Sequence, residues 1–304
     1  MVNSVEEVSV VLATYNRKQF LKTALESVLQ QTYPVKEIIV VDDRSDYDVE
    51  AFLINYINKI TLIINSDQKG SAYTYNRGIN ESSCEYITIL NDDDIFHPNK
   101  IKKQLDIFQQ NPDLGLVYCP IGTLKRNVLS YEPITYKKNK WVGLRHLNNI
   151  GITPLIKKEC FNMCGFFDNN LPYNEDRDLW YRIGKHYPFG FHQDPLYIEY
   201  NHSINRLSSS LKDICNGRIK LYKKHKVDFD QKEDYYSNLY YELAHEHQRF
   251  GGYASYLTYM LKSLQYKPTQ MFDYLNLPIE KIMGKKTVDS DEIITKLVSD
   301  WGDK

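Results

Sequence analysis

The sequence has almost no net charge, few cysteines and no long apolar run. Its 304 residues carry a formal net charge of −1 at pH 7, so bulk charge gives no reason to expect nucleic acid as a partner. No apolar stretch is long enough to span a bilayer, and the polar, acidic start at 1–7 does not have the form of a signal peptide. We therefore expect a cytoplasmic protein, with the inner face of the membrane as a second possible location.

The five cysteines are scattered along the chain and odd in number. Cys160 and Cys164 have no second pair at the spacing of a zinc site, so reduced thiols with structural roles are expected. Hydrophobic residues make up 42% and charged residues 25% of the chain. These values are ordinary for a globular protein and allow a large core in one or two domains.

The first third of the sequence alternates short apolar runs with segments of helical periodicity. The pattern predicts buried strands at 8–12, 37–41, 61–65 and 86–90, with helices between them at 20–31, 49–58 and 71–82. Repeated strand–helix–strand units imply parallel strands. Three of the strands end in polar loops, at 14–17, 42–45 and 92–94, and parallel topology gathers these loops at one edge of the sheet.

The remaining sequence is more mixed. We expect a helix at 98–109, a strand at 115–119, a helix at 176–186 and a strand at 196–200. After about residue 212 the pattern is helical and polar, with a helical hairpin at 236–250 and 253–266 that turns at Gly251-Gly252. A single hairpin of this kind cannot bury its own face. It must pack on the main domain or on another copy of the chain, which leaves a homo-oligomer through the tail open.

The strand predicted at 86–90 ends in Asn91 and three adjacent carboxylates, Asp92, Asp93 and Asp94. Like charges packed so closely repel, and their desolvation is costly unless a cation or strong donors compensate. A hard divalent cation takes oxygen ligands and commonly shares them with substrate phosphates. An Asp-rich turn before a helix explains the same residues without a metal. The run alone leaves both interpretations open.

Several segments taken together resemble the family 2 glycosyltransferases. They are VSVVLATYNR at 8–17, EIIVVDDRS at 37–45, EYITILNDDD at 85–94, CGFFD at 164–168 and NEDRDLW at 174–180. The similarity covers roughly residues 8–205 in the expected order. Residues 95–98 resemble the nonprocessive, spore-coat-type branch of the family. The Gln-X-X-Arg-Trp signature of processive members does not occur after Asp176, so we expect one sugar to be added at a time.

The resemblance implies a GT-A fold. This is an α/β fold with a Rossmann-like nucleotide-binding half and a mixed central sheet, followed here by a C-terminal helical extension. We expect the GT-A domain at 1–212, with its nucleotide-sugar half to about residue 120 and its acceptor half at 121–212. The extension would occupy 213–304.

The resemblance also implies an activity. It is inverting transfer of a hexosyl-type unit from a nucleotide-diphosphate sugar, first of all a UDP-sugar, with Mn²⁺ or Mg²⁺. The acceptor would be a hydroxyl of a glycan, a lipid-linked glycan or a protein, as in the synthesis of surface polysaccharides or glycoconjugates.

Donor contacts are expected in the first two loops. Asp43 stands where the family contacts the nucleotide base, and a carboxylate there can accept the imide N–H of uracil; an Asp in a turn is the alternative. The ring of Tyr15, in a loop with Ala13 and Thr14, could pack against the base or ribose, or simply in the core. Lys69, near a helix start, could meet a phosphate or be solvated.

The acidic cluster aligns with the family's Asp-X-Asp motif. Asn91 stands where the first Asp of the motif usually lies, which leaves the exact ligand set open. We expect Asp93 to be the direct metal ligand and Asp92 to contact the ribose or support the metal, with Asp94 as further support. His202, in a later loop, is a secondary candidate for the metal or the diphosphate, and a surface histidine is the alternative.

The resemblance assigns the general base to Asp176. Inverting transfer is a single displacement, so a carboxylate must take the proton of the acceptor hydroxyl on the face opposite the diphosphate. Glu175 could assist or substitute. The alternative is that acidic residues are favoured in any first helical turn, and Asp178 shows that not each of them need be catalytic.

Three other interpretations compete with this one. A signalling receiver domain shares the pattern Val40-Val41-Asp42-Asp43, but the length and the motifs at 160–180 argue against it. A nucleotidyltransferase would need a basic Gly-rich loop near the N-terminus. A catalytically inactive sugar-nucleotide-binding or scaffolding protein is supported by Asn91. The basic, aromatic stretch at 125–149, or the tail, would also allow peripheral association with a membrane.

Overall fold

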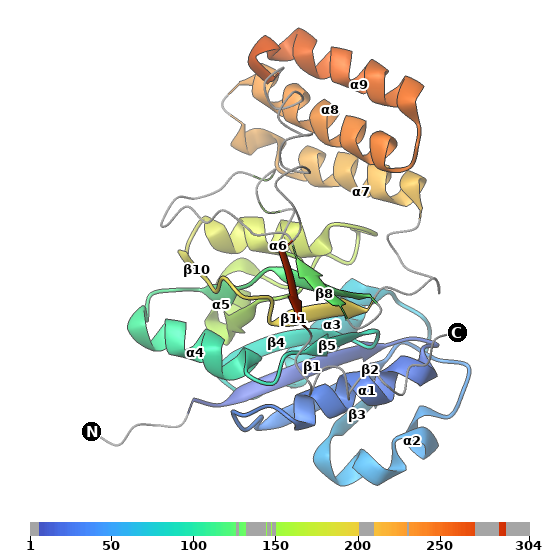
Figure 1. Cartoon of the computed structure of the whole chain (residues 1–304), viewed down its shortest axis with the longest axis vertical. Helices are drawn as coiled ribbons and strands as arrows, with labels where there is room; N and C mark the ends of the chain where they lie inside the picture. The colour runs from blue at the N-terminus through green and yellow to red at the C-terminus, as the bar shows by residue number, and fades with distance from the viewer. Residues whose placement is uncertain are drawn as a thin grey trace. The chain divides into compact units, whose positions relative to one another are not determined.

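The computed structural model describes residues 6–125, 128–131, 144, 147, 150–200, 210–229, 231–270 and 286–289 (Figure 1). The chain forms two compact units. The first comprises Met1–Asp168, Leu179–Asn201 and Lys286–Lys304, and the second comprises Asn169–Asp178 and His202–Lys285. Helix α6 (Glu175–Gly184) crosses the boundary, so its first four residues belong to the second unit.

Within the described residues, the first unit contains a seven-stranded mixed sheet in the order β10-β6-β9-β4-β1-β2-β3. Its parallel half consists of β1 (Val8–Thr14), β2 (Glu37–Asp42), β3 (Thr61–Ile64) and β4 (Tyr86–Asn91). These four strands confirm the prediction from the apolar runs. The antiparallel strand β9 (Leu155–Lys157) joins them to β6 (Leu116–Tyr118), and β10 (Phe189–Phe191) is parallel to β6.

A second sheet of the first unit has the order β12-β8-β7-β11-β5. Its strands are β5 (Asp94–Phe96), β7 (Ile121–Lys125), β8 (Val128–Tyr131), β11 (Tyr197–Tyr200) and β12 (Lys286–Asp289). The extension expected to be helical to residue 304 therefore contains a strand, which pairs antiparallel with β8. A strand of four residues is too short to show a period in the sequence.

Helices connect the strands of the first unit. They are α1 (Lys18–Leu29), α2 (Val49–Phe52), α3 (Ser71–Glu81), α4 (Lys100–Gln110) and α5 (Lys158–Cys164). The helix expected at 49–58 is instead one short α-turn followed by a 3₁₀ segment, Ile54–Lys59. Within the described residues, no helix is both long and apolar enough to cross a membrane.

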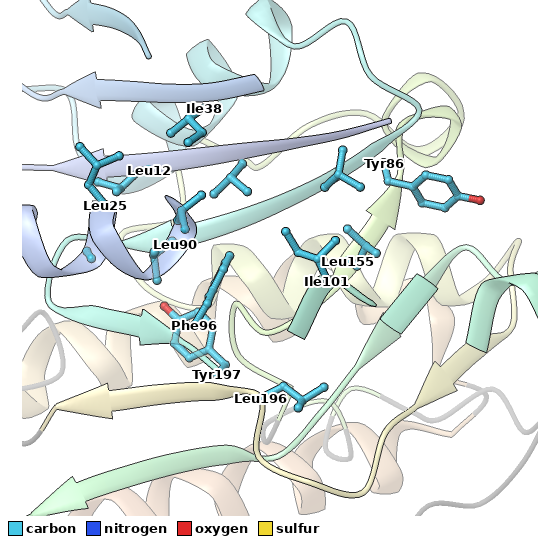
Figure 2. Packing of buried hydrophobic residues seen from close by; sticks show 14 of the residues in the cluster. Leu12, Leu25, Ile38, Tyr86, Leu90, Phe96, Ile101, Leu155, Leu196 and Tyr197 are labelled. Carbon is cyan, nitrogen blue, oxygen red and sulfur yellow. The ribbon is translucent and has the colours of Figure 1, made fainter. Parts of the chain in front are cut away.

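The largest part of the core lies where β1, β2 and β4 meet α1 and α4. Leu12 of β1, Leu25 of α1, Ile38 of β2 and Leu90 of β4 belong to one buried cluster (Figure 2). Strands covered on both faces are apolar along most of their length, as these are. Complete burial of such a side chain contributes roughly 1.5–3 kcal/mol. The central strands are therefore tightly packed, and this packing fixes the positions at which the loops begin.

The second unit is helical in its described part. It contains α7 (Leu211–Lys224), a 3₁₀ turn at Lys226–Asp228, α8 (Lys232–Arg249), α9 (Tyr253–Tyr266) and a final 3₁₀ turn at Pro268–Gln270. The hairpin of α8 and α9 confirms the prediction, with Gly251 at φ 77° in the turn. Stacked tyrosine rings lie along it, among them the pairs Tyr236–Tyr266 and Tyr240–Tyr259.

The division of the chain differs from the break expected at residue 212. Residues 169–178 group with the C-terminal helices and not with the sheet. The reason is a set of buried contacts between this segment and α7 and α8, such as the two hydrogen bonds from Arg177 to the carboxylate of Glu242, both 2.8 Å long.

Truncation of a core leucine tests the packing of the parallel strands. Leu12 is completely buried, so Leu12→Ala should lower the free energy of unfolding by about 2–5 kcal/mol, through lost burial and a residual cavity. Ile54 is 59% exposed, and Ile54→Ala should change it by less than about 0.5 kcal/mol. Urea unfolding followed by circular dichroism measures both. Equal effects would contradict this description of the core.

Candidate active site

The carboxyl ends of β1, β2 and β4 lie side by side because these strands are parallel neighbours. The register pairs Thr14 with Asp42, and Ala13 with Asn91. The loops that follow the three strands therefore start at the same edge of the sheet, as the sequence predicts. In open α/β sheets this is the edge where ligands bind.

The carboxylate of Asp92 is buried, with 2% of its surface exposed, and protein donors contact both of its oxygens. Oδ2 accepts hydrogen bonds from Thr14 Oγ1 at 2.8 Å and from the Tyr15 backbone N–H at 3.1 Å, and Oδ1 accepts one from Arg17 Nη1 at 2.9 Å. Burial raises the pKa of Asp92 to about 6, against the opposing charge of Arg17. Asp92 thus fixes the first loop against the end of β4.

Arg17 lies between two carboxylates. Its Nη1 atom is 2.9 Å from Asp92 Oδ1 and 3.1 Å from Asp93 Oδ1. Burial works against the charge of Arg17, but Asp92 and Asp93 raise its pKa above the ordinary value. Arg17 is not among the site residues expected from the sequence. The available signal was a cation two positions after Tyr15, in a loop that topology places beside the acidic cluster.

The three adjacent carboxylates have different surroundings. Asp94 begins β5 and accepts a hydrogen bond from Tyr197 Oη at 2.7 Å and one from Asn91 Nδ2 at 3.3 Å. Asn91 in turn accepts a hydrogen bond from Tyr75 Oη at 2.7 Å. An aspartate at position 91 would place a second negative charge beside Asp94. The amide of Asn91 therefore suits its place better than the carboxylate usual in the motif.

Asp43 holds the start of α3. Its Oδ1 accepts hydrogen bonds from Asn65 Nδ2 at 2.7 Å and the Lys69 backbone N–H at 2.8 Å, and its Oδ2 accepts one from the Gly70 N–H at 2.8 Å. The amine of Lys69 lies 3.2 Å from Asp67 Oδ2. The contact of Asp43 with a base and the contact of Lys69 with a phosphate therefore remain predictions.

The first two loops are tied together at their tips. The Asn16 backbone N–H donates to Ser45 Oγ at 2.9 Å, and the Asp46 N–H donates to Asn16 Oδ1 at 2.8 Å. Asn16 and Arg44 have φ values of 54° and 70°, in the left-handed region that lets each loop turn back. Tyr15, beside Asn16, is 38% exposed, so its ring is accessible for stacking.

Glu175 and Asp176 are in the second unit, in the first turn of α6. Glu175 is buried, whereas Asp176 keeps partial exposure. Burial raises the pKa of Asp176 to about 6, and Arg218 opposes this shift. Asp178 is fully buried and lies 2.8 Å from His225 Nε2 and 2.9 Å from Lys224 Nζ. His202 lies outside the described residues.

No group of three or more His, Cys, Asp or Glu side chains in the described part of the chain is arranged to hold a metal ion. Mg²⁺ and related ions at phosphate sites are commonly held by one or two carboxylates, with substrate phosphates and water as the other ligands. Of the adjacent carboxylates at the strand edge, Asp93 fits a site of this kind as the direct ligand, whereas both oxygens of Asp92 already accept hydrogen bonds from protein donors.

Comparison with known families agrees with this geometry. The model of "Glycosyl transferase family 2" matches residues 9–168, more than half of the chain. The chain belongs to glycosyltransferase family 2. The matched segment runs from Ser9 in β1 through β4 and includes all three loops at the strand edge and the acidic cluster.

Curated relatives named as glycosyltransferases are similar to the chain over more than this segment. An uncharacterised glycosyltransferase of Rickettsia prowazekii is 29% identical over 70% of this chain and 71% of its own length. The putative colanic acid biosynthesis glycosyl transferase WcaA of Escherichia coli is 28% identical over 75% and 85%.

Two solved structures share the fold. S. aureus TarS in complex with UDP-GlcNAc matches with a TM-score of 0.66 at 15% identity, over 86% of this chain and 81% of that one. The mannosyltransferase PcManGT of Pyrobaculum calidifontis, in complex with GDP-Man and Mn²⁺, matches with a TM-score of 0.60 at 15% identity, over 91% and 81%. Both agree with the predicted GT-A fold.

Replacement of Asp176 tests its environment without any ligand. The raised pKa of about 6, against about 3.9 in an unfolded chain, means that the folded state prefers the protonated carboxyl. The stabilisation is complete below about pH 4 and is lost as pH rises to about 6. The stability of the wild type relative to Asp176→Asn should therefore fall by about 3 kcal/mol across this window, at about 1.4 kcal/mol per pKa unit, and stay constant above it. Urea unfolding at pH 4 to 7 measures the difference; a constant difference would contradict the shift.

Proposed function

We propose that this family 2 protein is an inverting, metal-dependent, nonprocessive enzyme that transfers one sugar from a nucleotide-diphosphate sugar to an acceptor hydroxyl. The observation that carries the proposal is the set of carboxylates and donors at the strand edge. There Asp92 and Asp93 lie beside Arg17, and Asp43 orders the neighbouring loop. A diphosphate with its metal needs acidic ligands and a nearby cation in this combination.

The donor is proposed to be a nucleotide-diphosphate sugar, and a UDP-sugar is the first to test. Two structural neighbours support this class, since TarS was solved with UDP-GlcNAc and PcManGT with GDP-Man. In the proposal Asp43 accepts the imide N–H of the base, and Tyr15 stacks on the base or ribose. Lys69 approaches a phosphate from the start of α3.

Asp93, with Asp92 beside it, would hold Mn²⁺ or Mg²⁺. When bound, the ion neutralises negative charge on the departing diphosphate. Arg17 occupies the same pair of carboxylates, so in this proposal its guanidinium moves from Asp93 when the ion binds and can then meet a phosphate. Asp94 would act only indirectly, through its bonds with Asn91 and Tyr197.

Asp176 is proposed as the general base that takes the proton of the acceptor hydroxyl, with Glu175 next to it in support. A carboxylate with a pKa of about 6 is a stronger base than an ordinary aspartate and is still ionised at neutral pH. The acceptor would be a hydroxyl of a glycan, a lipid-linked glycan or a protein. Surface polysaccharide synthesis is a proposed setting, supported by the similarity to the E. coli relative, a putative colanic acid biosynthesis glycosyl transferase. The enzyme would act in the cytoplasm or at the inner face of the membrane.

Thermal unfolding with nucleotides tests the donor site. UDP and Mn²⁺ together should raise the melting temperature more than either one alone, because the ion is held by both the protein and the diphosphate. A ligand present at 100 times its Kd stabilises the folded protein by about 2.7 kcal/mol. A panel with UDP-GlcNAc and GDP-mannose then identifies the donor. No shift with any nucleotide, with or without metal, would contradict the proposal and favour an inactive scaffolding protein.

Substitutions separate the proposed roles of the two acidic residues. Asp93→Ala should lose the metal-dependent part of the thermal shift. Asp176→Asn should keep the donor-induced shift but lose donor turnover by about 10²–10⁴-fold, because it keeps the shape and removes the base. Asp113→Asn, at an exposed position, is the matched control and should behave as wild type. Near-normal turnover of Asp176→Asn would show that this residue is not the base.

A further inference from the structure

A network of buried charges joins the first turn of α6 to α7 and α8 within the second unit. Its members are all less than 10% exposed, and each has a charged or polar partner in the network. They are Asn174, Arg177, Asp178, Arg218, His225, Glu242 and Glu246. The proposed base Asp176 lies among them in sequence and in space.

Glu242 of α8 is the centre of the network. Its two carboxylate oxygens accept hydrogen bonds from Arg177 Nη1 and Nη2, both at 2.8 Å. Tyr222 Oη donates to Oε1 at 2.7 Å, and Arg218 Nε lies 3.2 Å from Oε2. A bidentate arginine–carboxylate pair fixes both the distance and the relative orientation of the two side chains. Arg177 follows Asp176 directly, so the position of α8 sets the position of this turn.

Helix α7 holds the same turn from another side. Arg218 Nη2 donates a hydrogen bond to Glu246 Oε1 at 2.8 Å, and Arg218 Nη1 donates one to Asn174 Oδ1. Asn174 directly precedes α6 and has a φ of 67°. A Cβ atom on Gly217 would lie 2.6 Å from Tyr173 Cβ and 2.7 Å from its carbonyl oxygen. Only glycine therefore allows α7 to approach the chain before α6 so closely.

The network is a costly way to hold helices together. Each buried charge loses its hydration, and well-packed apolar side chains of similar size often give equal or greater stability. What a hydrogen-bonded ionic network gives in exchange is a defined geometry. Arg177 and Asn174 lie on either side of Asp176, and Arg218 contacts Asn174. The network therefore defines the geometry of the backbone around Asp176.

We propose that α7 and α8 are part of the catalytic apparatus, and that Glu242 is a positioning residue that sets the orientation and charge of Asp176 through Arg177 and Arg218. This inference rests on the proposed function of Asp176 as the base. It assigns to the C-terminal helices a role in the transfer reaction itself.

The electrostatic consequence follows from the charges that face Asp176. Arg218 favours its ionised form, and Glu242 and Glu246 offset the charge of Arg218. The other ionisable groups nearby are Tyr173 before the helix, Glu175, Arg177 and Asp178 on it, and Lys224 and His225, which pair with Asp178. Removal of the Glu242 charge leaves both arginines less compensated, so it should lower the pKa of Asp176.

The test compares Glu242→Gln with Glu233→Gln, the same change at an exposed position of the same helix. The assay follows release of nucleoside diphosphate from the donor identified in the thermal screen, with water as acceptor. Glu242→Gln should lower kcat at least tenfold with the donor KM unchanged, and the acidic limb of the pH profile should move to lower pH. Glu233→Gln should match wild type in all three.

Two further variants separate position from charge and guard against misfolding. Glu242→Asp keeps the charge but shortens the side chain, so it should restore the acidic limb while kcat stays low. Tyr222→Phe removes one bond to Glu242 and keeps the ring, so it should lower kcat several-fold in a protein that folds. If Glu242→Gln does not fold, these two variants decide the question.

The outcomes distinguish this inference from the function on which it rests. Suppose that Asp176→Asn is inactive but Glu242→Gln keeps the wild-type kcat and pH profile, or that both Glu242→Asp and Tyr222→Phe keep them. The network would then be purely structural, and this result would overturn the inference but not the proposed function. An active Asp176→Asn would instead remove the base assignment. A low kcat with a shifted acidic limb in Glu242→Gln supports the inference.

Discussion

The buried carboxylate of Asp92 sets the arrangement of the strand edge. A carboxylate without partners would be strongly destabilising at 2% exposure. Its partners come from the end of β1 and the loop after it, through Thr14, Tyr15 and Arg17. The bonds that compensate Asp92 thus fix the loop, turn the ring of Tyr15 outward and bring the guanidinium of Arg17 to Asp93. The first loop and its contact with the acidic cluster depend on this one compensation.

The second unit meets the same physical problem in another way. There the buried charges outnumber those at the strand edge, and they compensate one another through Arg177, Arg218, Glu242 and Glu246. The two clusters differ in what they leave accessible. At the strand edge the exposed part is an aromatic ring beside an acidic pair. In the second unit it is Asp176, a carboxylate with raised pKa and partial exposure.

The departure at Asn91 and the contacts of Asp43 show how local surroundings change the meaning of a motif. Asn91 replaces a carboxylate of the family pattern, yet its amide donates to Asp94, where a second carboxylate would be repelled. Asp43 matches the pattern, yet its oxygens already hold the backbone at Lys69 and Gly70. A motif identifies which residues are available, and their neighbours decide what each of them can do.

The sequence by itself determined the parallel strands, the three polar loops at one edge, the helical hairpin and the family. These follow from local periodicity and from short motifs, which a single chain displays directly. Tertiary structure alone decided that Arg17 pairs with Asp92, 75 positions away, and that Arg177 pairs with Glu242, 65 positions away. It also decided that 169–178 group with the C-terminal helices and that 286–289 form a strand. The physical reason is that compensation of a buried charge depends on proximity in space, and no local pattern records which distant partner provides it.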